Sequence, residues 1–244
     1  MNASPAHDGA QLPLFPGEPW HLRGALCVSL WRIRPRDLPR WPLPHRARPL
    51  VTAGRATLLT FWADYRPPGV LAYRELLLLL VVRRRGRVRG TVVAAWVDNE
   101  RSRTGGRALW GIPKHSGEVC FETARLSLRP TAAPVTRACL TVEGAVAARG
   151  AWREVIPLPG RPALRARLLQ QRPAGPGDVP LRLSGRVALA RARFGAGPDT
   201  PLAFLAPHRP RLTVTVRDLR FSVGEPSARV RASPSRRSRG SAVA

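Results

Sequence analysis

Lys114 is the only lysine in a chain that carries 41 lysines and arginines together, so every other basic position of this kind is an arginine. It follows Pro113 in the segment Trp110-Gly111-Ile112-Pro113-Lys114. Because proline fixes its own φ angle and disfavours helix at the residue before it, we expect Lys114 to open an extended segment. A lysine amine can condense with a ketone to a Schiff base, whereas a guanidinium stays protonated and cannot. Lys114 is therefore a candidate nucleophile, and an ordinary surface lysine is the alternative.

Schiff-base chemistry requires the amine of Lys114 to be neutral. A lysine in water has a pKa of about 10.4, so little of it is neutral at pH 7. Burial among apolar side chains disfavours the ammonium, and Trp110, Ile112 and the apolar run Leu76–Val82 are candidates for such surroundings. His115 could add a positive charge, but adjacent side chains on a strand point to opposite faces. We therefore expect burial to be the main influence on the amine.

Three short motifs lead up to this lysine. Asp98-Asn99-Glu100 is followed after five residues by Gly106-Arg107, and after five more by Pro113-Lys114. This run resembles the acetoacetate decarboxylase family, in which the lysine after the proline forms the Schiff base. The resemblance extends over about residues 20–224 and implies that Lys114 is catalytic.

Two further segments are similar to motifs of the same family. Tyr73-Arg74-Glu75 looks like its Tyr-x-Glu motif, which implies that Glu75 is a catalytic residue that positions substrate or moves a proton. Pro19-Trp20-His21-Leu22-Arg23 looks like its entry segment and implies that Arg23 binds substrate, with two parallel hydrogen bonds to a carboxylate. The alternatives are a structural ion pair for Glu75 and an ordinary surface charge for Arg23.

The resemblance implies a lyase that acts on a small keto acid, decarboxylating acetoacetate or a related 3-oxo acid. Two departures bear on that activity: His115 replaces a second lysine of the family, and the segment near Thr60 has no acid before Asp64. The alternative within the superfamily is aldol-type condensation and dehydration on the same lysine. The chemistry requires no metal or organic cofactor, and the resemblance implies a homo-oligomer.

The net charge of +26 first suggests a nucleic-acid partner. An electrostatic binder has no reason to exclude lysine, so the abundance of arginine is more typical of a GC-rich coding bias acting on surface positions. The basic cluster Arg83–Arg89 is the best support for a nucleic-acid-binding protein, the alternative of a different class. Aromatic residues are only 6% of the chain and do not interleave with that cluster, as base stacking would require.

The cysteines and the apolar runs mainly exclude other classes. Cys27, Cys120 and Cys139 are odd in number and lack CxxC spacing, so we expect buried, inert thiols and no disulfide framework or metal site. The longest aliphatic run, Leu76–Val82, has seven residues, whereas a membrane-spanning helix needs about twenty. We expect no membrane association, and a reducing, cytoplasmic setting.

Short runs of alternating or continuous apolar residues, separated by proline, glycine and arginine, predict a mainly β chain. One helix is expected around residues 164–171. The resemblance implies a partly closed antiparallel β-barrel of the acetoacetate decarboxylase-like type with one or two short helices, although the strand pattern alone is equally compatible with a sandwich. We expect a loose lead-in over residues 1–15, one domain over 16–224 and a disordered Ser/Arg-rich tail over 225–244. The strands are expected at residues 25–31, 57–62, 75–82, 91–97, 138–147, 181–194 and 212–223.

Overall fold

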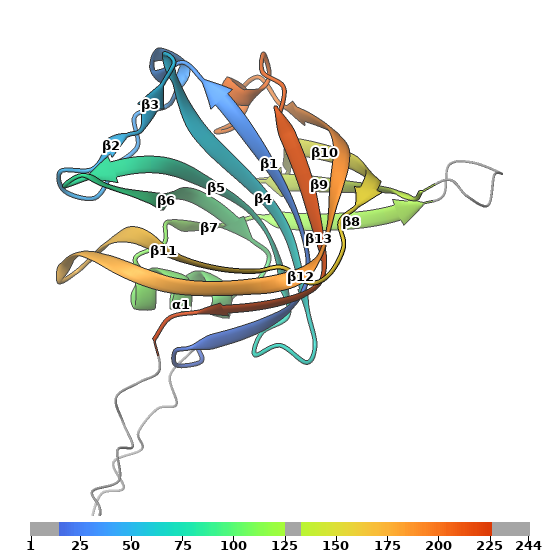
Figure 1. The fold of residues 1–244 in the computed structure, drawn as a ribbon, viewed down its shortest axis with the longest axis horizontal. Coiled ribbons are helices and arrows are strands. Elements are labelled where there is room, and N and C mark those ends of the chain that lie inside the picture. The colour runs from blue at the N-terminus through green and yellow to red at the C-terminus, as the bar shows by residue number, and fades with distance from the viewer. Residues whose placement is uncertain (1–14, 125–132, 226–244) are drawn as a thin grey trace, which may run out of the picture.

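The computed structural model describes residues 15–124 and 133–225, and strands dominate them (Figure 1). Nearly all of the predicted lead-in and tail therefore lies outside the described residues. One α-helix, α1 (Glu100–Trp110), and two 3-10 turns, η1 (Pro35–Asp37) and η2 (Ala203–Leu205), accompany the sheet. The strands are β1 (Trp20–Ile33), β2 (Arg48–Pro49), β3 (Val51–Thr52), β4 (Arg55–Arg66), β5 (Tyr73–Arg84), β6 (Arg87–Val97), β7 (Lys114–Ser116), β8 (Glu118–Ala124), β9 (Val135–Val142), β10 (Ala145–Pro157), β11 (Ala163–Arg172), β12 (Gly175–Ala196) and β13 (Leu212–Val223).

Seven strands form a ring in the order β11-β6-β5-β4-β1-β13-β12, and β12 pairs with β11 to complete it. Every pairing around the ring is antiparallel except β6–β11, where the single pair Leu168 and Gly90 joins the strands in parallel. Strands β10, β9 and β8 continue the sheet outward from β12. The prediction of a mainly β, partly closed structure with one or two short helices is confirmed. The ring is joined by the fewest residue pairs between β6 and β11.

Two hydrophobic cores lie on opposite faces of the ring strands. All seven ring strands contribute to one of them, so this core fills the interior of the ring. The other core lies between the outer face of the ring and the extension formed by β8, β9 and β10. The largest fully buried side chains of the inner core are Trp20, Leu22 and Trp110, and those of the outer core include Trp31, Ile33, Leu58, Leu76, Leu78, Leu80, Leu140, Leu202 and Leu205.

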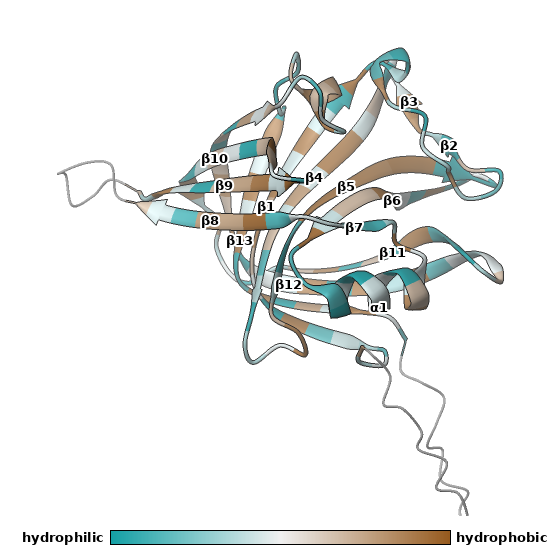
Figure 2. Ribbon diagram, turned by 180° about the vertical axis from the view of Figure 1, so that it is seen from behind, coloured by the Kyte–Doolittle hydropathy of each residue, from teal (hydrophilic) through white to brown (hydrophobic). Residues whose placement is uncertain are grey.

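Strand β5 separates the two cores, which explains its continuous apolar sequence. Leu76, Leu78 and Leu80 face the outer core, while Leu77 and Leu79 pack against the inner one. Successive side chains on a strand point to opposite faces, so a strand buried on both sides has no polar face. In Figure 2, β5 is accordingly hydrophobic along most of its length.

The hairpin predicted between β5 and β6 is present, with Arg84 opposite Arg87 and a two-residue turn between them. Arg85 and Gly86 both have positive φ angles, 46° and 77°. Two-residue hairpins favour such turns because their twist matches that of the flanking strands. The turn sets the register as far as Leu79, and a β-bulge between Leu78 and Leu79 then shifts it by one residue, which places Glu75 opposite Val97.

The helix predicted around residues 164–171 was wrong. These residues lie in strand β11, which pairs with β12 over its whole length. A composition rich in arginine and leucine is compatible with a helix or a strand. The antiparallel pairing with β12 stabilises the strand. The α-helix of the described chain is instead α1, which carries the Asp98-Asn99-Glu100 motif at its start.

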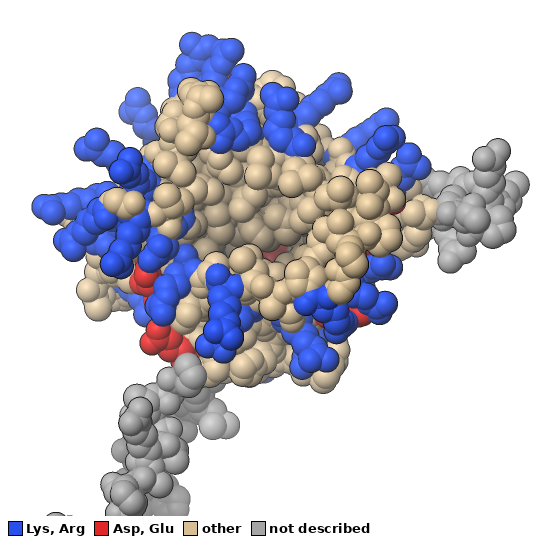
Figure 3. Space-filling view, viewed as in Figure 1, with Lys and Arg blue, Asp and Glu red and all other residues tan. Residues whose placement is uncertain are grey.

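The surface is strongly basic. Figure 3 shows arginine side chains around the rim of the viewed face and a hollow near its centre whose walls are largely uncharged. No helix in the described ranges is long and apolar enough to cross a membrane.

Candidate active site

Lys114 is the first residue of β7, a short strand that pairs in parallel with β6 and places Lys114 beside Ala95. Ala95 belongs to the inner core, so the lysine side chain enters the interior of the ring. Only 3% of Lys114 is exposed. Its Nζ donates a hydrogen bond to Ser102 Oγ at 2.9 Å and lies 3.1 Å from Glu75 Oε2. The amine is thus buried and held between a hydroxyl and a carboxylate.

Glu75 lies on the inner face of β5 and is 4% exposed. Tyr65 on β4 donates a hydrogen bond from its hydroxyl to Glu75 Oε1 at 3.2 Å. The other oxygen, Oε2, accepts no well-aligned hydrogen bond within the described part of the chain, although the lysine amine is its close neighbour. This carboxylate therefore has one oxygen held by a hydrogen bond and one that faces the lysine amine.

Two tyrosines flank the pair. The ring centroids of Tyr65 and Tyr73 are 4.7 Å apart, and Nζ of Lys114 lies 3.5 Å from the Tyr73 hydroxyl and 4.8 Å from its ring centroid. Burial, and next the charge of Glu75, raise the pKa of both tyrosines well above the usual value. Both hydroxyls therefore stay protonated over the neutral range and can act as hydrogen-bond donors.

Helix α1 supplies Ser102 because Asn99 caps its first turn. The Asn99 side chain accepts a hydrogen bond from the backbone N–H of Ser102, which is a standard N-cap contact. At the other end, Gly111 adopts a left-handed conformation (φ 66°), and a Cβ there would lie 2.0 Å from the carbonyl oxygen of Gln171. The Asn99 cap fixes the helical turn that carries Ser102, and the left-handed Gly111 directs the following Pro113-Lys114 segment back into the ring.

The two glycines of α1 make room for this arrangement. A Cβ on Gly106 would lie 2.8 Å from both Cδ and Cε of Lys114, and one on Gly105 would lie 2.6 Å from the ring of Trp20. Gly106 therefore allows the lysine stem to run directly against the helix. This is a direct contact between two motifs, Gly106-Arg107 and Pro113-Lys114, that are separate in the sequence.

His115 points away from the amine, as alternation along a strand predicts. Its ring lies against Trp96, with centroids 5.9 Å apart, and Trp96 belongs to the outer core. Burial lowers the pKa of His115, and the nearby charges of Arg107 and Arg103 lower it further. A mostly neutral histidine on the other face does not replace the positive charge of a second lysine.

The structure does not bring Arg23, the predicted substrate-binding residue, to the amine of Lys114. Arg23 follows Leu22, which faces the inner core, so its own side chain points to the opposite face of β1 and is exposed. Its cross-strand neighbours are the exposed Arg66 and Arg220. The position offers no support for a role in holding the carboxylate of a substrate bound at Lys114.

A cleft of about 1140 Å³ borders the lysine segment and includes Lys114, His115 and Trp96 in its lining. Leu78 and Trp96 place this cleft mainly on the outer face, whereas the amine and its partners lie on the inner face. The hollow in Figure 3 opens between the ring strands on the viewed side. No group of three or more side chains suited to hold a metal ion occurs in the described ranges.

Comparison with known proteins identifies the family of the chain. A family model described as acetoacetate decarboxylase (ADC) matches residues 44–215, more than half of the chain, and the chain belongs to that family. No curated protein matches it.

Several solved structures share the fold. The enduracididine biosynthesis enzyme MppR with HEPES buffer bound is 18% identical with a TM-score of 0.63, covering 92% of this chain and 97% of that one. An acetoacetate decarboxylase from Legionella pneumophila is 13% identical with a TM-score of 0.61, covering 93% and 96%. An acetoacetate decarboxylase-like enzyme from Sphingomonas wittichii RW1 is 16% identical with a TM-score of 0.59, covering 91% and 97%.

Sequence reasoning brought Lys114 and Glu75 into one site but missed three residues around them. Tyr65 carries no motif, and its place follows only from its register opposite Tyr73. Ser102 could have been found from the Asn99 cap, had a helix been expected there. Gly106 stood in the Gly106-Arg107 motif without a role of its own, and the structure shows that it leaves room for the stem of Lys114.

Proposed function

We propose that this protein is a Schiff-base-forming lyase that acts on a small keto acid, with decarboxylation of acetoacetate or a related 3-oxo acid as its reaction. The observation that carries the proposal is the single lysine of the chain, buried with its Nζ 3.1 Å from a buried carboxylate and 2.9 Å from a serine hydroxyl. Membership of the acetoacetate decarboxylase family supports an enzyme of this superfamily.

The first half of the reaction forms the iminium. Glu75 takes a proton from the Lys114 ammonium, and the free amine adds to the ketone carbon of the substrate. Proton transfer to the resulting alkoxide gives a carbinolamine, which loses water to leave a positively charged iminium. The open oxygen of Glu75, Oε2, lies where the ammonium proton must go. Ser102 accepts a hydrogen bond from the nitrogen and so orients it.

The second half breaks the bond to the carboxylate. The electron pair of that carbon–carbon bond moves to the iminium nitrogen, carbon dioxide leaves, and an enamine forms. Protonation of the enamine carbon and addition of water release the ketone and regenerate the amine. A substrate carboxylate beside Glu75, in an interior lined by apolar side chains, is poorly stabilised, and its loss as an uncharged gas relieves that repulsion.

Aldol-type condensation and dehydration on the same lysine is the second candidate. It is favoured by the similarity of the fold to MppR, which has been solved with pyruvate and with the condensation product of pyruvate and imidazole 4-carboxaldehyde. His115 points away from the amine, so the second lysine of the family decarboxylases has no counterpart next to Nζ. Both reactions begin with the same iminium and differ in which bond of the substrate then breaks.

The test is borohydride trapping during incubation with acetoacetate, followed by peptide mass mapping. We expect a reduced isopropyl adduct on Lys114, because reduction after decarboxylation leaves the carbon skeleton of acetone on the nitrogen. Since the chain has one lysine, an adduct elsewhere can only be on the N-terminal amine, which the map distinguishes. The Lys114→Arg variant keeps the positive charge and should form no adduct.

A panel assay separates the two reactions. Acetoacetate and other 3-oxo acids are scored for carbon dioxide release, and pyruvate with an aromatic aldehyde is scored for loss of the aldehyde absorption. Equal rates for the native protein and Lys114→Arg in every assay, together with an unmodified lysine after borohydride, would remove the enzyme proposal. Trapping on Lys114 with condensation but no carbon dioxide release would select the aldol reaction.

A further inference from the structure

Two of the three cysteines lie directly opposite each other on neighbouring strands. Cys120 on β8 pairs with Cys139 on β9 in the antiparallel register. Cys120 is exposed and Cys139 is half-buried, so the sequence-based expectation that the thiols are buried was wrong for both. It holds for the position of Cys27, which is buried on β1 and whose thiol pKa is raised by burial.

The register brings the two thiols within range of a disulfide. Residues directly opposite in an antiparallel pair project to the same face with Cβ atoms about 4.5–5.5 Å apart. A disulfide needs Cβ atoms about 3.5–4.5 Å apart, so a small approach of the strands suffices. Burial raises the pKa of Cys120, and the neighbouring Cys139 thiol raises it further.

The thiols line a small cleft of about 410 Å³ together with three arginines, Arg137, Arg149 and Arg193. Arg149 is directly opposite Cys139 on β10, and Arg137 lies two residues before Cys139 on the same face of β9. Within the described part of the chain, none of these arginines forms an ion pair or a side-chain hydrogen bond. The acidic member of the lining is Glu122, which sits opposite Arg137 on β8.

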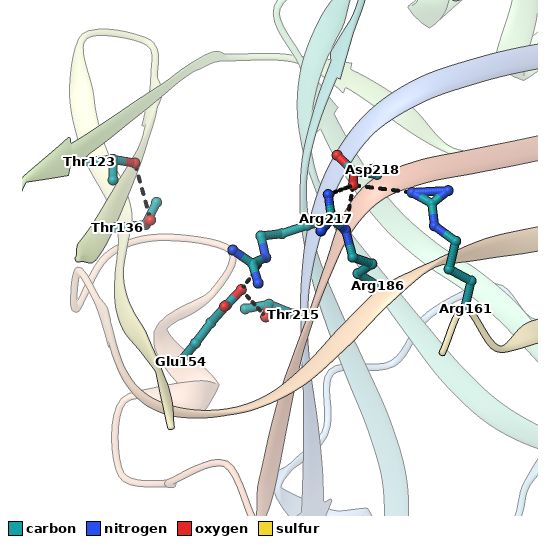
Figure 4. Close-up of polar contacts among 8 residues, drawn as sticks. All are labelled: Thr123, Thr136, Glu154, Arg161, Arg186, Thr215, Arg217 and Asp218. Atoms are coloured by element: carbon teal, nitrogen blue, oxygen red, sulfur yellow. Dashed lines mark hydrogen bonds and ion pairs between the residues drawn. The ribbon is translucent and has the colours of Figure 1, made fainter. Parts of the chain in front are cut away.

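Other arginines on or beside the same sheet are paired with acids. Asp218 on β13 pairs with Arg186 and Arg161 (Figure 4). Glu154 on β10 pairs with Arg217 and accepts a hydrogen bond from Thr215. The arginines beside the thiols keep their charge free for an external anion.

The basic surface continues beyond the thiols. A larger cleft of about 1520 Å³ shares Arg137 and Arg193 with the thiol cleft, and no aspartate or glutamate among the described residues lines it. Arg153 and Arg191 stand directly opposite each other there, an arrangement of like charges that destabilises the sheet unless an anion or water offsets it. Six arginines line this cleft: Arg137, Arg153, Arg191, Arg193, Arg209 and Arg211.

We propose that Cys120 and Cys139 form a reversible dithiol–disulfide site, and that the surrounding arginines select anionic small-molecule disulfides as its oxidants. The thiolate of one cysteine attacks the oxidant disulfide, which forms a mixed disulfide and releases one thiolate. The second cysteine, as its thiolate, attacks the protein sulfur of the mixed disulfide and releases the other thiolate. Two protein thiols are oxidised, one disulfide is reduced to two thiols, and two protons are released on the protein side and taken up by the products.

The test uses the full chain in reduced form and glutathione disulfide, which is anionic, as the oxidant. We expect loss of two of three titratable thiols, a mass two hydrogens lower than that of the reduced protein, and a peptide pair that links Cys120 to Cys139. Dithiothreitol should restore all three thiols. Cys27 is the internal control, because its thiol should react only after denaturation. A stable glutathione adduct on Cys120 with Cys139 still free, or no reaction at either residue, would overturn the site.

The arginine selection is tested with the cationic disulfide cystamine. We expect glutathione disulfide to react faster than cystamine by about tenfold at low salt, with the difference shrinking as salt screens the charges. The double variant Arg137→Gln, Arg149→Gln should remove most of that preference. The matched control is Arg161→Gln, Arg186→Gln, which loses the same charge beside Asp218 and should keep the preference. Equal rates for both oxidants in the native protein, or the same loss in both variants, would overturn the selection.

Discussion

Gly106→Ala is expected to disable the lysine while leaving the fold nearly intact. The new Cβ would lie 2.8 Å from Cδ and Cε of Lys114, where ordinary contacts begin at 3.4 Å, so the stem must retreat by about 0.6 Å. The amine at its end is held by contacts of 2.9 Å to Ser102 and 3.1 Å to Glu75. A displacement of this size loosens both contacts together.

The two effects of this substitution on stability oppose each other. Overpacking costs about 1–3 kcal/mol in a rigid core, but a lysine stem is flexible and brings the cost toward the lower end. Alanine in place of glycine favours the helix by about 0.5–1 kcal/mol. We therefore expect the free energy of unfolding to change by no more than about 1 kcal/mol. Misplacement of a reacting group by about 1 Å can lower a rate by about 100-fold, so borohydride-trapped adduct should form about 10- to 100-fold more slowly.

Gly105→Ala is the matched control, because it makes the same chemical change one residue earlier on the same helix. Its Cβ would meet the buried ring of Trp20 at 2.6 Å, and a ring packed on all sides cannot retreat as a lysine stem can. We expect a loss of about 1–3 kcal/mol in unfolding free energy with adduct formation largely retained. Denaturant unfolding and single-turnover trapping measure the two quantities on the same samples.

The two glycine variants should therefore rank in opposite orders for stability and for reaction. Native-like trapping in Gly106→Ala would refute the reasoning that this glycine positions Lys114. The same reasoning would be refuted if adduct formation slowed in both variants in proportion to their loss of unfolding free energy.

Three other substitutions test the surroundings of the site. Glu75→Gln removes the acceptor for the Lys114 ammonium proton, so trapping should fall about 100-fold or more and partly recover as pH is raised; an unchanged rate near neutral pH would contradict that role. Tyr65→Phe leaves Glu75 Oε1 buried without its hydrogen bond, and denaturant unfolding should show a loss of about 1–3 kcal/mol; a neutral result would mean that water replaces the hydroxyl. Burial and the charge of Arg107 lower the pKa of His115 below 6.5, so the unfolded state binds more protons at this residue than the folded state does. The free energy of unfolding should therefore fall as the pH drops through about 6.5, and this pH dependence should be shallower in His115→Gln. Identical pH profiles for the native protein and the variant would contradict this prediction.

Much of the sheet follows from local pattern. The apolar run of β5, the turn at Arg85-Gly86 and the return strand β6 are adjacent in sequence, and their alternation and turn chemistry are visible without the fold. Residues 164–171 show the limit of such reasoning. Their pattern suits a helix or a strand, and the choice depends on β12, which pairs with them from the next segment of the chain.

The chemistry of the site was visible in the sequence for a related reason. A lone lysine among arginines, and a glutamate at the start of an apolar strand, are unusual residues in their local surroundings, so both Lys114 and Glu75 could be identified one at a time. Arg23 is one arginine among many, and its side chain direction depends on which face of β1 turns toward the ring. Local sequence carries no signal for that choice.

The amino-acid sequence by itself determined which groups are available: one lysine amine, one carboxylate in an apolar strand, and three thiols. Only the tertiary structure decided which of them meet, because cross-strand register and ring closure join residues that are distant in the chain. Tyr65 reaches Glu75 through the β4–β5 register, and Cys120 faces Cys139 through the β8–β9 register. A shift of one residue in either pairing would turn one of its two side chains to the other face of the sheet and separate that pair.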